Sequence, residues 1–231
     1  MDSSGTLALV GGSEWTEGCT FDAGLLAASG GRDVLVLPTA AAYQHPERAV
    51  LRAAEWFGPL GGDVEGLMVV DRASAEDAGM AATVAKARFI YLSGGSPLHL
   101  RAVLKKSAVF EALRRAYAGG AVVAGAGAGA MVLTDPMVDP RGGALTLGLG
   151  LVDNLAVVPH FGDEHDDAHG QKLHRTVAMA PAGLPVVALP ARTALIHDPG
   201  GTWRSEGAGT PAVFVGGTRT EGLGALGSPA G

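Results

Sequence analysis

The sequence predicts an α/β fold, a three-layer sandwich with a mainly parallel sheet, and three observations support this. Short apolar segments of strand length alternate with longer segments of helical pattern through the first 130 residues or so. Several of the apolar segments end in glycine-bearing turns, which suit a change from strand to helix. The chain has 231 residues, of which 47% are hydrophobic and 17% charged, so it can bury the core of one large domain.

The first half of the chain is a series of strand and helix candidates. The expected strands occupy residues 6–10, 33–37, 64–70, 89–92 and 121–124. The expected helices occupy residues 21–29, 46–56, 74–85, 98–104 and 109–118. Pro46 at the start of its helix fits the fixed φ of proline. Ser74 and Asp77 predict a capped helix start with an acidic partner.

The pattern changes after Met131. Residues 135–143 are rich in turn formers, residues 145–149 and 155–158 resemble short strands, and residues 164–178 predict a polar helix. Further apolar segments predict a final antiparallel edge, at residues 186–189, 193–197 and 212–215. We expect a single domain over residues 1–217 and a flexible tail rich in Gly, Ala and Ser over residues 218–231.

Composition and charge exclude several classes of function. The net charge of −6 and the lack of a Lys/Arg run argue against nucleic-acid binding. No apolar run approaches the ~20 residues of a membrane helix, and the first residues lack the pattern of a secretory signal. The single cysteine, Cys19, fits a reducing compartment. We therefore expect a cytoplasmic protein that contacts neither nucleic acid nor membrane.

Residues 122–131 have the layout of a nucleophile elbow, in which an apolar strand ends in small residues and a helix follows. The pattern of such an elbow is G-x-S-x-G, and its sharp turn exposes the central serine. Here Gly125 and Gly129 hold the flanking positions and Gly127 holds the central one. The bland alternative is a Gly/Ala-rich turn that never carried a nucleophile. Under both interpretations, the central residue of the turn, Gly127, has no side chain that could act as a nucleophile.

Other candidate site residues follow the expected strands. Ligands bind at the carboxyl ends of parallel strands, where the turns at residues 11–13 and 94–96 also fall. A glycine pair there can direct backbone N–H groups at an oxyanion. Gly94-Gly95, before Pro97 and a helix, suits a pocket lining better than Gly11-Gly12, which we interpret as simple turn glycines. His160 follows a strand directly and could act as a general base.

Metal and nucleotide sites are weaker interpretations. His165 and His169 lie one helical turn apart among carboxylates, so a metal site with His160 can be considered. A solvated acidic helix is the commoner case, and no H-E-x-x-H motif is present. The sequence also lacks a Walker A motif and a G-x-G-x-x-G with a suitable acidic partner. We expect no metal and no other cofactor.

Taken in order, the motifs resemble those of the serine hydrolases that include cyanophycinase and peptidase E, an α-aspartyl dipeptidase. The matching segments are residues 7–12, 36–40, 90–97 with Leu100, 125–131, 159–161 and 193–195. Ordered co-occurrence over most of the chain is more specific than any one motif. The resemblance implies a class I glutamine amidotransferase-like (flavodoxin-like) fold and a serine-type peptidase site.

The resemblance also implies roles for individual residues. The family's elbow is G-[TS]-S-A-G-A, which puts the nucleophile position on Gly127 and the base position on His160. It places the oxyanion and substrate-binding positions on Gly94, Gly95, Ser96 and Ala128. The acidic residue often found before the family's T-A-L segment has no counterpart near Pro190-Ala191. Asp135 or Asp139 could orient His160, and the sequence leaves open which.

The missing serine decides the functional expectation. Removing the nucleophile of a serine hydrolase costs on the order of a million-fold in turnover. We favour a non-catalytic relative, a pseudopeptidase that binds a small peptide or amino-acid-like ligand and could form a homodimer. One alternative is an active peptidase that uses a displaced nucleophile such as Ser96 or Ser93, has a natural serine altered at 127, or uses water activated by His160. A metal-dependent hydrolase using His160, His165 and His169 is the weakest alternative.

Overall fold

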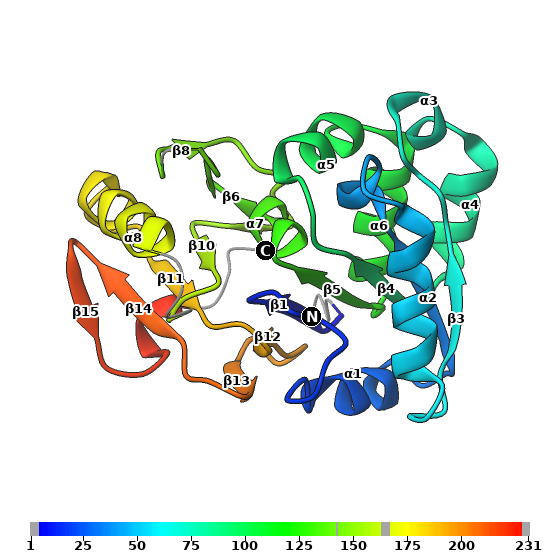
Figure 1. Ribbon diagram of the computed structural model, residues 1–231, viewed down its shortest axis with the longest axis horizontal. Helices are drawn as coiled ribbons and strands as arrows, with labels where there is room; N and C mark the ends of the chain where they lie inside the picture. The colour runs from blue at the N-terminus through cyan, green and yellow to red at the C-terminus, as the bar shows by residue number, and fades with distance from the viewer. Residues whose placement is uncertain (1–4, 142, 163–166, 228–231) are drawn as a thin grey trace.

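A seven-stranded sheet forms the centre of the computed structural model, which describes residues 5–141, 143–162 and 167–227. The strand order is β13-β12-β1-β5-β4-β2-β3. From β1 to β3 neighbouring strands are parallel, whereas β12 and β13 are antiparallel additions at the β1 side. Helices cover both faces of the sheet (Figure 1). The predicted three-layer α/β fold is confirmed.

The strands of this sheet are short and mostly buried. They are β1 (Leu7–Val10), β2 (Asp33–Leu37), β3 (Asp63–Gly66), β4 (Phe89–Leu92), β5 (Val122–Ala126), β12 (Thr193–His197) and β13 (Trp203–Gly207). The helices of the same half are α1 (Phe21–Ser29), α2 (Pro46–Phe57), α3 (Arg72–Ala75), α4 (Ala78–Lys86), α5 (Pro97–Leu104), α6 (Ala108–Ala118) and α7 (Ala128–Leu133), with a 3₁₀ turn η1 (Thr39–Ala41) before α2.

The alternation of side chains along each strand produces two cores, one on each face of the sheet. In β4, Phe89 and Tyr91 pack with residues of α1 and α2, including Phe57. Ile90 and Leu92 point the other way, into the larger core formed with the helices of the opposite layer. Successive side chains of a strand face opposite sides, so a fully apolar strand fills both cores.

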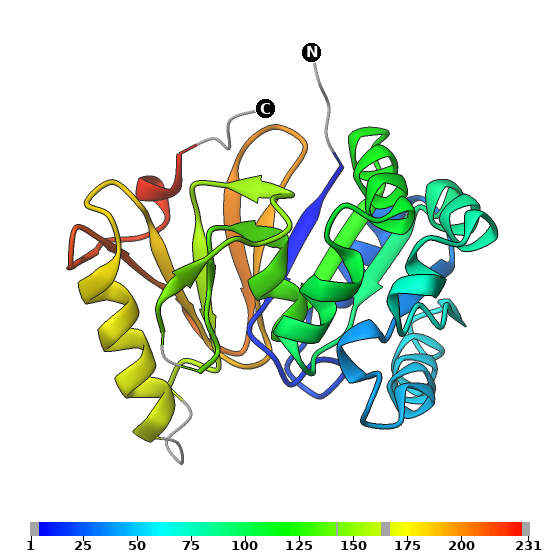
Figure 2. The same ribbon diagram turned by 90° about the horizontal axis from the view of Figure 1, so that it is seen from above.

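A second, four-stranded sheet lies beside the first (Figure 2). It contains β10 (Ala156–Pro159), β11 (Val186–Leu189), β14 (Ala212–Val215) and β15 (Thr218–Thr220). Helix α8 (Asp167–Met179) covers it, with Leu173 and Val177 packed against the core of this sheet. Short strands join the two halves: β6 (Thr134–Asp135) with β9 (Val152–Asp153), and β7 (Met137–Val138) with β8 (Leu145–Thr146). A 3₁₀ turn, η2 (Gly224–Leu226), follows β15.

Three sequence expectations require correction. The segments expected to form one antiparallel edge belong to two sheets, because β12 pairs with β1 whereas β11 and β14 pair with each other. The expected flexible tail begins with β15, which pairs with β14. Residues 74–85 are two helices, since Asp71 and Asp77 each cap a helix start by accepting a backbone N–H, from Ser74 and Met80 respectively.

No helix within the described ranges is long and apolar enough to cross a membrane. Cys19, the only cysteine of the chain, is buried as a free thiol.

Candidate active site

A pocket of about 520 Å³ opens where β1, β4 and β5 end. Five of the sequence-predicted positions line it: Gly94, Gly95, Gly127, Ala128 and His160. The structure therefore brings together residues separated by up to 66 positions, as expected for the carboxyl edge of a parallel sheet. Residues outside the predicted set also line it, among them Glu14, Gln44, Arg48 and Arg52.

Gly127 forms a sharp turn between β5 and α7. Its φ of +50° and ψ of −102° are strained for a residue with a side chain, and its N–H donates to the Val10 carbonyl at 2.9 Å. A Cβ placed on Gly127 would lie 3.6 Å from Nε2 of His160. A hydroxyl one bond beyond such a Cβ falls within hydrogen-bond reach of this nitrogen. The turn thus has the geometry of a nucleophile elbow, with no nucleophilic atom at its centre.

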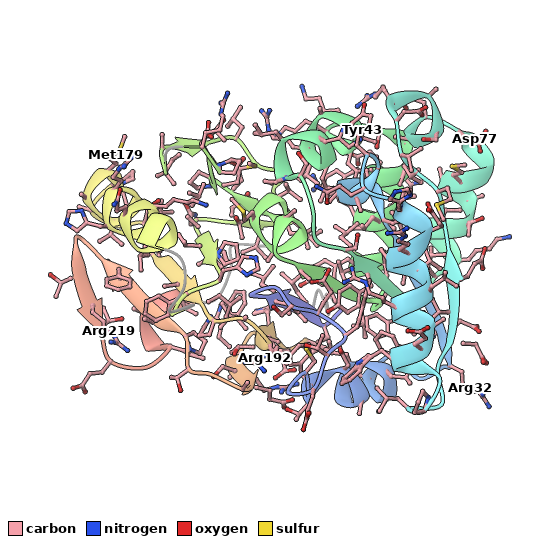
Figure 3. The ribbon with its side chains drawn as sticks, in the orientation of Figure 1. Arg32, Tyr43, Asp77, Met179, Arg192 and Arg219 are labelled. Carbon is pink, nitrogen blue, oxygen red and sulfur yellow. The ribbon has the colours of Figure 1, made fainter. Side chains whose placement is uncertain are left out.

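His160 follows β10 and is held at the pocket by its backbone. Its N–H donates to the Gly11 carbonyl at 2.9 Å. A Cβ on Gly12 would lie 2.1 Å from Cε1 of the imidazole, so the ring packs on bare backbone. The Gly12 carbonyl accepts the N–H of Arg192, which Figure 3 labels, at 2.8 Å. Gly12 therefore does more than permit a turn: its missing side chain leaves the space that the ring fills.

A carboxylate lies against the predicted oxyanion glycines. Oε1 of Glu14 accepts the N–H of Gly94 at 2.8 Å, and the Glu14 side chain is half-buried in the pocket wall. Glu14 was not among the predicted site residues. Its position in the sequence could have indicated a site residue. Glu14 directly follows the glycine-bearing turn after β1, and a charged side chain there lies at the ligand-binding edge of the sheet.

Helix α2 contributes positive charge to the pocket. Arg48 and Arg52 are four residues apart and therefore lie on the same face of the helix. Both are exposed, and within the described ranges no carboxylate forms a salt bridge with either guanidinium. The sequence shows two arginines four residues apart in an expected helix. It does not show that this face of the helix points toward the pocket.

The serines considered as displaced nucleophiles have local partners. Oγ of Ser96 accepts the N–H of His99 at 3.3 Å and so caps α5. Ser93 is buried, and its hydroxyl donates to the Gly94 carbonyl at 3.4 Å. Ser96 was also expected to bind substrate; its hydroxyl caps the helix start, and a role in substrate binding stays a prediction.

The two carboxylates considered as partners of His160 have structural contacts. Oδ1 of Asp135 accepts the N–H of Gly148 at 3.1 Å. Both oxygens of Asp139 accept hydrogen bonds from the Arg141 guanidinium, at 3.0 and 2.7 Å. These bonds and the positive charge of Arg141 lower the pKa of Asp139 to about 2. An orienting role of either carboxylate toward His160 stays a prediction.

The metal alternative depends largely on residues that the structure does not describe. His165 lies outside the described residues, and so does the side chain of His169. Within the part of the chain that is described, no group of three or more His, Cys, Asp and Glu side chains is arranged to hold a metal ion.

A buried polar cluster supports the loop that carries Glu14. Asp22 is fully buried, and its Oδ2 accepts Nε1–H of Trp56, on α2, at 2.9 Å. Burial raises the pKa of Asp22 to about 7; the nearby charge of Glu14 also raises it, while the Trp56 hydrogen bond opposes the shift. Among the described residues, Oδ1 of Asp22, the hydroxyl of Tyr91 and Nε1 of Trp15 lack hydrogen-bond partners. One buried group beneath the loop, Asp22, therefore changes its protonation near neutral pH.

Comparison with known proteins places this chain in a family. The model of peptidase family S51 matches residues 7–202. A cyanophycinase from Synechococcus elongatus is 28% identical over 196 residues, which cover 80% of this chain and 60% of that protein. The chain thus spans less than two thirds of the length of this curated relative.

Two solved structures share the fold. The crystal structure of a peptidase from an acI-B1 Actinobacterium superposes with a TM-score of 0.81 at 25% identity, covering 94% of this chain and 93% of that one. A Listeria monocytogenes EGD-e protein assigned as a peptidase E gives a TM-score of 0.69 at 17% identity, covering 89% of this chain and 100% of that one, which indicates a shared fold only. Since the family model spans most of the sequence, the chain belongs to peptidase family S51, with the cyanophycinase and peptidase E-like proteins.

Proposed function

We propose that this chain is a non-hydrolytic member of peptidase family S51 that binds a small peptide or amino-acid-like ligand in the pocket over Gly127. One observation carries the proposal. Gly127 has no side chain that could attack a carbonyl, although a Cβ built on it would lie 3.6 Å from Nε2 of His160. Loss of such a nucleophile costs on the order of 10⁶ in turnover.

The charges of the pocket support a small zwitterionic ligand. Glu14 supplies a carboxylate and α2 supplies the Arg48 and Arg52 guanidiniums, all lining the same pocket. An amino acid or short peptide carries an ammonium and a carboxylate group that complement these charges. A volume of about 520 Å³ is within the usual range of small-molecule sites.

The proposal is tested by covalent labelling together with ligand binding. Wild-type protein should stay unlabelled by a fluorophosphonate probe and should hydrolyse aspartyl and arginyl dipeptides no faster than background. Calorimetry with the same dipeptide panel should detect binding. Gly127→Ser should restore labelling, because His160 already lies beside the new side chain. Ala128→Ser, which adds a hydroxyl to the same pocket one residue away, should stay unlabelled.

Two results would overturn the proposal. Wild-type hydrolysis at ordinary enzyme rates, ~1–10³ s⁻¹, would show an active peptidase; without labelling, it would indicate water activated by His160. Failure of every dipeptide in the panel to bind would remove the ligand-binding role.

A further inference from the structure

We propose that Arg48 and Arg52 each bind one carboxylate of the same ligand residue, so that the pocket selects peptides that end in aspartate or glutamate. The inference rests on the proposed function and names the class of ligand for the same pocket. Its central observation is that two guanidiniums from one face of α2 line the pocket, while within the described ranges no carboxylate forms a salt bridge with either.

The packing of α2 fixes the direction of its arginine face. Ala49 is buried in the core between α2 and the sheet, and it also lines the pocket. Arg48 and Arg52 flank this buried side of the helix. Trp56, four residues further along the same row, donates Nε1–H to the buried Asp22 of α1 at 2.9 Å. The row that carries both arginines is therefore anchored, and its first part borders the pocket.

The charges that line the pocket do not balance. Glu14 contributes one negative charge, whereas the two arginines contribute two positive charges. His45 also lines the pocket, but its Nδ1 lies 3.2 Å from Oε1 of Glu47, which balances a charge on this ring. The pocket thus has an excess of positive charge in a chain whose net charge is −6. A neutral zwitterion offers one carboxylate to two guanidiniums, whereas a ligand with a second carboxylate pairs with both.

The arginine pair is unfavourable for the helix itself. Like charges four residues apart repel each other on a helix surface. Arg48 also lies in the first turn, directly after Pro46 and Glu47, where the helix dipole disfavours a positive charge. In the part of the chain that the structure describes, neither guanidinium gains an ion pair in return. Two bound carboxylates would reduce both repulsions, which favours a role of the pair in ligand binding over a role in the fold.

The spacing of the pair fits two carboxylates of one residue. Positions four residues apart are separated by about 6 Å along a helix axis, and two long side chains can converge from there on a small group. In a C-terminal aspartate or glutamate, the side-chain carboxylate is only a few bonds from the α-carboxylate. In a peptide with an N-terminal acidic residue, the two free carboxylates belong to different residues. The pair therefore favours an acidic residue at the C-terminus.

The first experiment compares three dipeptides by calorimetry on the wild-type protein. Ala-Glu carries both carboxylates on its last residue, Ala-Gln lacks the side-chain charge, and Glu-Ala has the net charge of Ala-Glu with the acidic side chain on its first residue. Ala-Glu should bind about fivefold more tightly than either of the others, since an exposed charge pair contributes up to ~1 kcal/mol. If Ala-Gln or Glu-Ala binds as tightly as Ala-Glu, or more tightly, the inference is overturned.

The second experiment assigns the preference to the arginine pair. Arg48→Ala together with Arg52→Ala should reduce the preference for Ala-Glu over Ala-Gln to less than about twofold. Arg114→Ala together with Arg115→Ala removes the same two charges from exposed positions of α6 that do not line the pocket, and should keep the preference. The inference fails if the preference survives the first double substitution. It also fails if both double substitutions abolish the preference, because the overall charge would then explain it.

Side-chain NMR checks that both guanidiniums take part. Saturating Ala-Glu should shift the Nε–H resonances of Arg48 and Arg52, whereas Ala-Gln should shift one of the two. Equal shifts of both by the two dipeptides, or a shift of fewer than two by Ala-Glu, contradict the inference.

Failure of the inference and failure of the proposed function give different results. Absence of binding by all three dipeptides overturns the inference, while binding of other dipeptides of the aspartyl and arginyl panel would keep the proposed function. Hydrolysis of any dipeptide by the wild-type protein at ordinary enzyme rates overturns the proposed function without changing the expected order of affinities.

Discussion

The pocket has two walls that are built in different ways. The backbone wall consists of Gly12, Gly127 and His160, which the ends of β1, β5 and β10 position. The charged wall consists of Glu14, Arg48 and Arg52, which come from the loop after β1 and from α2. Main-chain hydrogen bonds fix the first, since Gly127 and His160 donate to the carbonyls of Val10 and Gly11. The two arginines of the second are exposed side chains on a helix.

This difference explains how the elbow keeps its shape with a glycine at its centre. The backbone wall depends on strand pairing and packing, so the absence of one serine side chain leaves its geometry in place. The charged wall depends on individual side chains, and substitutions of exposed residues rarely change stability by more than ~0.5 kcal/mol. We therefore expect reactivity to depend on the backbone wall and ligand affinity on the charged wall.

The largest expected effect separates reactivity from binding. In the Gly127→Ser background, His160→Ala should lower the fluorophosphonate labelling rate about 10²–10⁴-fold, because a general base contributes that much. Dipeptide affinity, measured by calorimetry, should change by less than about threefold. His174→Ala, the same substitution on the exposed face of α8, is the control. Rapid labelling without His160 would assign the base to another group and break the comparison.

The second effect concerns the buried acid beneath the charged wall. Burial raises the pKa of Asp22 from 3.8 to about 7, so the folded state keeps a proton that the unfolded chain releases above about pH 4. The free energy of unfolding should therefore fall as the pH rises from about 4 to 7 and level off above that range. At ~1.4 kcal/mol per pH unit, the loss approaches ~4 kcal/mol.

Asp22→Asn should remove most of this pH dependence while keeping an acceptor for Trp56. Urea denaturation at several pH values checks the slope for wild type and variant. Asp63→Asn, at an exposed ion pair with Arg32, should keep the wild-type slope. A wild-type stability that does not fall between pH 4 and 7 would show that Asp22 is charged in the folded protein.

The third effect tests the space under the imidazole. Gly12→Ala places a methyl group 2.1 Å from Cε1 of His160, at a φ of +102° that disfavours a side chain. We expect a loss of about 1–3 kcal/mol in stability, and slower labelling when Gly127→Ser is also present. Gly24→Ala adds the same methyl group on α1 with nothing within 4 Å, and should stabilise by up to about 1 kcal/mol. Equal melting temperatures for the two variants would contradict the close packing of the His160 ring on Gly12.

Parts of this molecule could be predicted because their signals are local. Phe89–Leu92 is an apolar run between a charged residue and a glycine-bearing turn, and it forms β4 with the expected bounds. Gly127 was found because an elbow is defined by adjacent residues. Partners that depend on long-range pairing were not predictable in this way: Val186–Leu189 and Thr193–His197 are close in sequence but pair in different sheets.

The charged wall shows the same limit. Glu14 and Gly94 are 80 residues apart, and no periodic pattern connects them. The sequence put Arg48 and Arg52 on one helix face, but the pocket they line is set by the packing of α2 on the sheet. A local sequence pattern therefore locates the reactive turn, whereas the electrostatics of the pocket follow only from the assembled fold.

The smallest effect belongs to the arginines of this wall. Arg48→Ala together with Arg52→Ala should weaken binding of the tightest dipeptide in the panel by about tenfold, since each exposed charge pair contributes up to ~1 kcal/mol. The loss should shrink in high salt, where exposed charges are screened. Arg32→Ala, whose guanidinium pairs with Asp63, should leave affinity unchanged. Labelling of Gly127→Ser should also be unaffected. If the two arginine substitutions lowered the labelling rate of Gly127→Ser as well as dipeptide affinity, α2 would be shaping the backbone wall. The two walls would then form a single unit.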